Sequence, residues 1–133
     1  MSELYGGMVM ASDVQPGVQW VKRSDVHPMA TAPGVEMRPM FGEGFLTCWV
    51  KLDPGAGVPE HSHVHEQIGV VTAGAIEVTV AGETRSLGVG EAYLVAPHAP
   101  HAASAGPGGC ELVETFVPVR EDFRALWEGS KPA

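Results

Sequence analysis

Hydrophobic and polar residues alternate along most of this chain, in short segments separated by glycine and proline. Residues 45–52 are typical: Leu46, Cys48, Val50 and Leu52 share one face, and Phe45, Thr47, Trp49 and Lys51 share the other. A period of two indicates half-buried β-strands. The same reading predicts strands at 67–73, 75–80, 84–90, 92–97 and 110–119. Many short strands at even spacing predict an all-β sandwich or barrel.

Two segments depart from this pattern. In residues 120–129, Phe123, Leu126 and Trp127 recur at helical spacing and Gly129 follows, which predicts one short C-terminal helix. The N-terminal residues 1–17 show no such order, and we expect a flexible arm there. A strand is expected at 18–22, at the start of a single domain that spans 18–133.

Composition narrows the functional classes. With 133 residues, 44% of them hydrophobic, the chain can bury one good core but not two. A formal charge of -8 argues against nucleic acids and anionic membranes as partners. No apolar run approaches the roughly 20 residues of a membrane span, and the N-terminus does not resemble a signal peptide, so we expect a soluble cytoplasmic protein. Cys48 and Cys110 are isolated and are expected to be buried.

Histidines are concentrated in one short segment. Three of the six fall within residues 61–65. In an extended segment His61 and His63 project from the same face, so their imidazoles can converge on one metal ion. A single histidine before a strand would be an ordinary polar loop residue, but this pair favours a ligand cluster. His98, which Pro97 and Pro100 bracket, and His101, which follows them, are the downstream candidates for a third ligand.

A carboxylate lies on an apolar strand face near the C-terminus. Within 110–119, Glu114 shares its face with Cys110, Leu112 and Phe116. Burial among hydrophobic side chains raises the pKa of a carboxyl group unless it is paired, which suits a general base. The alternative is an acid at a solvated barrel mouth. Arg120 is either its salt-bridge partner or a surface residue of the last helix.

Residues 55–74 and 90–101 resemble the two motifs of the cupin family: Gly55, five residues, His61-x-His63, three residues, position 67, six residues and Gly74, and later Gly90 leading through proline to His101. The resemblance implies a double-stranded β-barrel, or jelly roll, with His61, His63 and His101 as metal ligands. The motif's glutamate position holds Gln67. Using Glu66 instead would need a one-residue slip, which turns a side chain to the other face. His65 and His98 are then expected at the rim.

The expected cofactor is one divalent transition metal ion. Iron, nickel, zinc, manganese and copper all accept imidazole and amide ligands, so the residues do not choose among them. Three neutral imidazoles and a neutral amide would leave the ion its full charge, which favours Lewis-acid over redox chemistry.

Within the cupins, segments 61–71, 90–101 and 116–123 are most similar to the small bacterial pectin-degradation cupins, which linearise unsaturated uronate sugars. That group uses a His, His, Gln, His metal set, matching His61, His63, Gln67 and His101. An acid, an aromatic residue two positions later and an arginine four beyond it complete its active site, matching Glu114, Phe116 and Arg120. The acid of the group is usually aspartate, so Glu114 departs from it by one methylene.

These features together predict an enzyme in which Glu114 moves a proton and Arg120 holds an oxygen of a small carbonyl or hydroxy-carbonyl substrate. The predicted cavity walls are Phe45, Trp49, Tyr93 and Phe116. Uronate linearisation is the first choice. A polyketide cyclase or a dioxygenase is the alternative, which an apolar cavity would favour, and a non-catalytic small-ligand-binding cupin is a third. Residues 1–22 are expected to pair with a partner's sheet in a homodimer.

Overall fold

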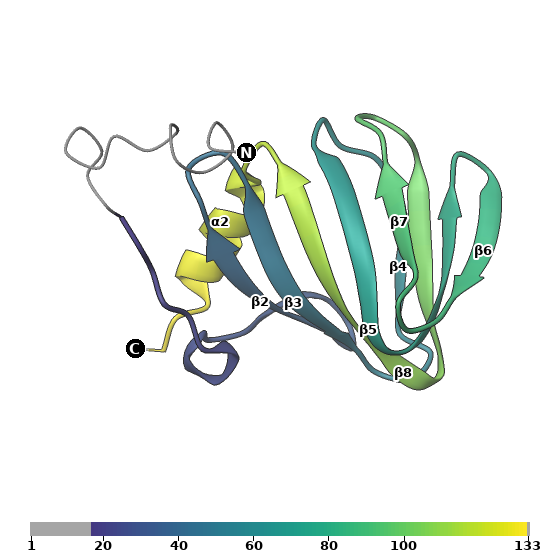
Figure 1. The fold of residues 1–133 in the computed structure, drawn as a ribbon, viewed down its shortest axis with the longest axis horizontal. Helices are drawn as coiled ribbons and strands as arrows, with labels where there is room; N and C mark the ends of the chain where they lie inside the picture. Colours follow the sequence, from purple (N-terminus) through teal and green to yellow (C-terminus); the bar gives the residue numbers. More distant parts are fainter. Residues whose placement is uncertain (1–16, 133) are drawn as a thin grey trace, which may run out of the picture.

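The computed structural model describes residues 17–132 (Figure 1). Strands dominate, and one helix follows them near the C-terminus, as the sequence predicts. In chain order the elements are η1 (Arg23–Asp25), β1 (Met29–Ala32), β2 (Val35–Phe41), β3 (Leu46–Leu52), β4 (Gly57–His61), β5 (Glu66–Val80), β6 (Glu83–Leu87), β7 (Ala92–Val95), β8 (His101–Val117) and α2 (Glu121–Gly129).

Two long strands, β5 and β8, form the centre of the fold and belong to both of its layers. The order is β1-β2-β3-β8-β5-β6, with β4 paired to β8 and β7 paired to β5, and all of these pairings are antiparallel. One layer uses the first half of β5 and the second half of β8, together with β7, β3, β2 and β1. The other layer contains the second half of β5 and the first half of β8, together with β6 and β4. This is the predicted jelly roll, although the strands within residues 17–132 do not pair into a closed ring.

Glycines allow the two central strands to bend between the layers. The β5–β8 register shifts on both sides of Gly74, between Val71 and Ala73 and again between Gly74 and Ile76. Gly74 has φ +70°, and a Cβ placed there would overlap the carbonyl oxygen of Gly109. Only a residue without a side chain fits this crossing.

The core lies between the layers and is formed by the inward face of the alternating strands. On β3, Leu46, Cys48, Val50 and Leu52 are buried, as predicted. Leu112 and Phe116 of β8 and Val71 of β5 lie beside them in the same layer and are each about 1% exposed. Cys48 and Cys110 are both buried free thiols. The same alternation along the strands also turns some polar side chains toward the interior.

Helix α2 is anchored to the strands through its aromatic residues. The Trp127 indole Nε1 donates to the His27 carbonyl at 2.9 Å, and the two rings stack with centroids 4.2 Å apart. Trp127 also contacts Phe41 of β2, and Phe123 lies edge-on to Phe116. Because the helix begins directly after Arg120, this packing fixes that residue beside the core.

Several boundaries differ from the predictions. Residues 18–22 form no strand, so that prediction is wrong: the alternation is present, but Trp20 is 93% exposed and no strand within residues 17–132 pairs with it. The segments predicted at 67–73 and 75–80 are one strand, β5. Strands β1 and β2 were not predicted. Of the expected arm, residues 1–16 lie outside the described part of the chain. No helix within residues 17–132 is long and apolar enough to cross a membrane.

Candidate functional site

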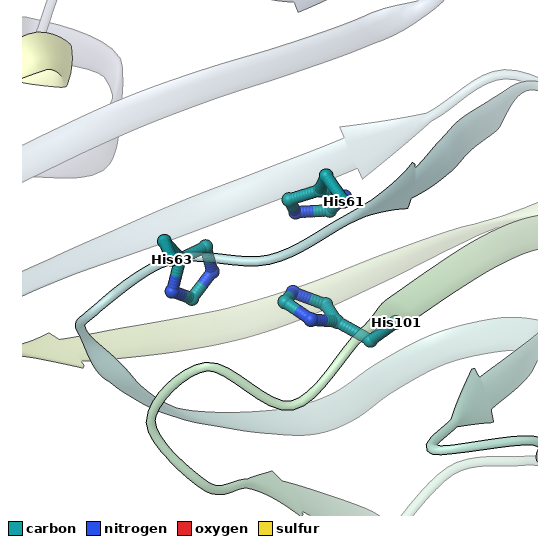
Figure 2. A group of neighbouring side chains, drawn as sticks. All are labelled: His61, His63 and His101. Carbon is teal, nitrogen blue, oxygen red and sulfur yellow. The ribbon is translucent and has the colours of Figure 1, made fainter.

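Three of the predicted metal ligands meet at one point. Nitrogen atoms of His61, His63 and His101 all lie within 4.8 Å of one another. His61 ends β4 and His101 begins β8, where the two residues are register partners, and His63 follows on the connection to β5. Figure 2 shows the three rings gathered around a common space. The spacing of the histidines in the sequence therefore brings together the expected cluster.

The hydrogen bonds of the rings prepare their other nitrogens for a metal. Each Nδ1 lies 2.8–2.9 Å from a backbone carbonyl two residues away: His61 with Pro59, His63 with His65, and His101 with Ala99. A carbonyl only accepts, so Nδ1 carries the proton and the Nε2 lone pair is free. Burial lowers the pKa of His63 and of His101, which favours neutral rings. The buried Nε2 of His101 has no hydrogen-bond partner among the described residues. These properties fit a divalent metal ion.

Gln67 lies beside the histidines at the start of β5. Its side chain is buried, 5% exposed, and its Oε1 is 3.1 Å from Nε2 of His63. Glu66, the alternative at this position, is exposed. The alternation of β5 thus turns Gln67 inward, as the motif spacing predicts, and supplies an amide oxygen as a fourth candidate donor.

Glu114 occupies the same cavity from the second half of β8. It is opposite Cys48 of β3 and Gly69 of β5 in the register. The Tyr93 hydroxyl donates to its Oε1 at 3.0 Å. Burial raises the pKa of Glu114 to about 7, while the hydrogen bond from Tyr93 and the charge of Arg120 lower it by less. A carboxyl group that titrates near neutral pH can both accept and return a proton.

Arg120 also lines the cavity and is only 9% exposed. It does not pair with Glu114. Its Nε and Nη2 donate to the two carboxylate oxygens of Asp122, at 3.2 and 2.7 Å. The guanidinium lies 3.6 Å from the centre of the Phe123 ring. Sequence reasoning did not select Asp122, because its contact depends on how the chain turns into α2.

The predicted aromatic walls divide into two pairs. Tyr93 and Phe116 line the cavity, whereas Phe45 and Trp49 do not. Trp49 lies on the outward side of β3, opposite the face of Cys48, and Phe45, which directly precedes that strand, is 45% exposed. Placing Phe45 and Trp49 in the wall is therefore wrong, because strand parity and not aromatic character decides which side chains face inward.

The remaining histidines of the two motifs lie outside this cavity. His65 is half-buried, with its ring 5.5 Å from that of His63. His98 is exposed and adopts φ +67°. The rest of the cavity wall is mainly aliphatic and includes Val35, Met37, Val50, Leu52, Val58, Ile76 and Val78. Polar groups are therefore concentrated at the histidine cluster and beside Glu114.

Comparison with known proteins agrees with this geometry. The chain is 39% identical over 84 residues to the pectin degradation protein KdgF of Dickeya dadantii, a match that spans 62% of this chain and 76% of the relative. The structure of KdgF from Halomonas sp. superposes with a TM-score of 0.76 and 29% identity, covering 80% of this chain and 99% of that one. An RmlC-like cupin from Shewanella frigidimarina gives 0.75 and 29%, covering 83% and 99%.

The model of the cupin domain matches residues 48–116, which is more than half of the chain and includes all three clustered histidines, Gln67 and Glu114. Together with the jelly-roll topology, this match establishes that the chain belongs to the cupin family.

Proposed function

We propose that this protein is a metal-dependent cupin enzyme that isomerises an unsaturated uronate sugar from its ring form to its linear form. The observation that carries the proposal is Glu114, whose pKa is raised to about 7 in a cavity shared with the histidine cluster. The 39% identity to a pectin degradation protein supports the choice of a uronate substrate.

The reaction needs one proton to leave and another to arrive. In an unsaturated uronate, a proton leaves the anomeric hydroxyl, C1 becomes an aldehyde carbonyl as its bond to the ring oxygen breaks, and the resulting enolate becomes a ketone when C4 takes up a proton. No atom is gained or lost. Glu114 would accept the first proton and supply the second, which a carboxyl group titrating near pH 7 can do. Arg120 would bind the sugar carboxylate, since its guanidinium faces the same cavity.

His61, His63, Gln67 and His101 would hold one divalent ion of iron, nickel, zinc, manganese or copper. When bound, such an ion supplies Lewis-acid polarisation of a substrate oxygen. The protein's own contribution is the fixed orientation of the imidazoles through their Nδ1 hydrogen bonds. Among the described residues that line the cavity, Arg120 is the one lysine or arginine, which gives a substrate carboxylate a single cationic side chain to bind.

Glu114→Gln tests the reaction. The substitution preserves the shape of the side chain but removes the base, which typically contributes a factor of about 10² to 10⁴ in rate. Proton NMR of an unsaturated uronate follows the loss of the vinyl signal at C4, with the uncatalysed rate subtracted. Glu114→Asp should lose less activity than Glu114→Gln. Glu111→Gln is the matched control, because Glu111 lies on the same strand but pairs with Arg23 outside the cavity. Near-full activity of Glu114→Gln would contradict the proposal.

His63→Ala and His101→Ala test the metal site. Each variant should lose most of the metal that the wild-type protein binds, measured by elemental analysis of protein purified without a nickel column. His98→Asn is the control: His98 is exposed, and asparagine tolerates its positive φ. A full equivalent of metal retained in both alanine variants would exclude this ligand set.

A polyketide cyclase or dioxygenase is the second candidate, and one observation favours it: most side chains that line the cavity are apolar. Turnover of an aromatic or polyketide substrate, with none of a uronate, would select it. A non-catalytic ligand-binding cupin would bind such molecules without converting them, in the wild-type protein and in Glu114→Gln alike.

A further inference from the structure

Tyr93, Gly69 and Glu114 form one row across three neighbouring strands. Gly69 of β5 is the register partner of Tyr93 on β7 and also of Glu114 on β8. The side chains of Tyr93 and Glu114 both line the cavity, and Gly69 between them is buried. A Cβ at position 69 would overlap the Tyr93 ring and hydroxyl. The ring therefore lies across β5, in a space that only glycine leaves open, and its hydroxyl reaches the side chain of β8.

The Tyr93 hydroxyl distinguishes the two carboxylate oxygens of Glu114. It donates to Oε1 at 3.0 Å. Oε2 has no hydrogen-bond partner among the described residues, and it is not one of their enclosed polar atoms that lack a partner. Because Glu114 lines the cavity, Oε2 is the oxygen that is open to a bound molecule. Burial raises the pKa of Tyr93 well above its usual value, so the hydroxyl keeps its proton and remains a donor.

A glutamate needs such a restraint if it is to act as a base. Each rotatable bond of its side chain lets the carboxyl group take up further positions. Proton transfer requires that the base lie within hydrogen-bond reach of the proton that it accepts. A hydrogen bond to one oxygen restricts the carboxyl group and leaves the other oxygen free. Arg120 does not supply this restraint, because its guanidinium donates to Asp122.

We propose that Tyr93 is a positioning residue for Glu114: its hydroxyl fixes one carboxylate oxygen so that the other oxygen faces the cavity and exchanges the proton with the substrate. This inference rests on the proposed function, in which Glu114 is the base. Tyr93 itself transfers no proton. A displacement of about 1 Å at a reacting group can cost about 100-fold in rate, so the loss of the hydroxyl should lower kcat more than it changes KM.

Tyr93→Phe tests the inference, because it removes the hydroxyl and keeps the ring across Gly69. With metal supplied in excess, kcat on an unsaturated uronate should fall by about 10- to 100-fold, while KM should change by less than about threefold. Thr79→Val is the control, since it deletes an exposed hydroxyl that bonds Thr84 outside the cavity. This variant should keep the wild-type kcat. An unchanged kcat in Tyr93→Phe would overturn the inference.

A double-mutant cycle separates positioning from a general effect on the fold. Aspartate ends one methylene short of the Tyr93 hydroxyl, so Tyr93→Phe should change kcat little when it is combined with Glu114→Asp. An equal loss with and without Glu114→Asp would contradict a positioning role.

The pH profile of kcat/KM gives a second readout. Burial raises the pKa of Glu114, and the hydrogen bond from Tyr93 lowers it by less. Without this hydrogen bond the base ionises only at higher pH, so the acidic limb of the profile should move to higher pH in Tyr93→Phe. Loss of a purely structural contact would lower kcat/KM evenly and leave the limb in place, which would also count against the inference.

The groups around Glu114 allow a test without substrate. Cys48 of β3, Tyr93 of β7, Arg120 and, on the same strand, Cys110 are the titratable or charged groups that interact with it. Burial raises the pKa of both thiols and of the phenol, and arginine stays charged. Among these groups only Glu114 therefore changes its charge between pH 5 and pH 8.

Urea unfolding of metal-free protein uses this difference. Tyr93→Phe should lose more stability, relative to wild type, at pH 8 than at pH 5, because at pH 8 the ionised carboxylate loses its hydrogen-bond donor. Thr79→Val should lose the same amount at both pH values. A wild-type protein that does not convert uronates would refute the proposed reaction, and the pH-dependent loss would still show that Tyr93 holds the carboxylate. An equal loss at both pH values in Tyr93→Phe would overturn the inference by itself.

Discussion

At the scale of single residues, the burial that raises the pKa of Glu114 in the cavity also has a cost in stability. Its pKa is raised from 4.5 to about 7 by burial, so the folded protein holds this proton more tightly than the unfolded chain does. Stability therefore falls as pH rises from about 4.5 to about 7, and remains lowered above that range. A shift of about 2.5 pKa units corresponds to about 3 kcal/mol.

We therefore expect Glu114→Gln to raise the free energy of unfolding at pH 8 by up to about 3 kcal/mol, because the variant buries no charge. At pH 5 the difference should be much smaller. Urea denaturation of metal-free protein at the two pH values measures both, with Glu111→Gln as the control. A variant that is less stable than wild type at pH 8 would show that the ionised carboxylate is better solvated or paired than the structure indicates.

Asp122 carries the second residue-scale prediction. It neutralises Arg120 and fixes its guanidinium through two hydrogen bonds, although its own side chain is 60% exposed. Asp122→Ala should raise KM for a carboxylate substrate about three- to tenfold and change kcat less, since a charge-assisted hydrogen bond near solvent contributes about 1 kcal/mol. Glu121→Gln is the control, because that side chain pairs with Arg124 at the surface. Equal kinetics in wild type and Asp122→Ala would exclude a positioning role.

Residue-scale features are predictable from the sequence where they depend on local alternation. The parity of β5 and β8 is enough to predict that Gln67 and Glu114 face inward, and both line the cavity. The contacts of Tyr93 depend on how β7 aligns with β5 and β8, which involves residues far apart in the sequence. Phe45 and Trp49 do not line the cavity, because alternation sets them on the other side of residues 45–52 from Cys48, and aromatic character does not change that side.

At the scale of secondary structure elements, the bend in β5 is the feature with the strictest steric requirement. Gly74→Ala should destabilise the protein by about 3 kcal/mol or more, since it adds a methyl group against the Gly109 carbonyl to the cost of a positive φ. Gly82 has φ +83° with open space around it, so Gly82→Ala carries the φ cost alone, about 1–2 kcal/mol. Thermal or urea unfolding of the two variants gives the difference. Equal losses would mean that the bend relaxes without cost.

The sequence pattern predicts a strand correctly where the strand has polar residues on one side and the core on the other. Alternation located β3, and helical spacing located α2 within one residue of its start. Residues 18–22 alternate in the same way but form no strand. A strand also needs a neighbouring strand for its backbone hydrogen bonds, and residues 18–22 have none within the described part of the chain. Strand β2 was missed: it contains Pro39, and β1 pairs only with its first residues, from Val35 to Met37.

At the scale of the whole molecule, the homodimer stays a prediction. Residues 1–22 are proposed to pair with the sheet of a second copy; of these, 18–22 form no strand and Trp20 is 93% exposed. Static light scattering at micromolar concentration should give the mass of a dimer, and Trp20→Ser should shift the mass toward a monomer if this segment contributes to the contact. A monomeric wild-type protein would refute the proposal.

The two central strands also determine how the molecule can come apart. Because β5 and β8 pass through both layers, neither layer can lose its strands without pulling residues from the other. Unfolding should therefore be all-or-none, and amide hydrogens on either side of the bend should exchange at similar, globally limited rates. The candidate ligands lie at the ends of the same strands: Gln67 near the start of β5 and His101 at the start of β8. An ion bound there would slow exchange in both layers at once, including strands that do not touch it.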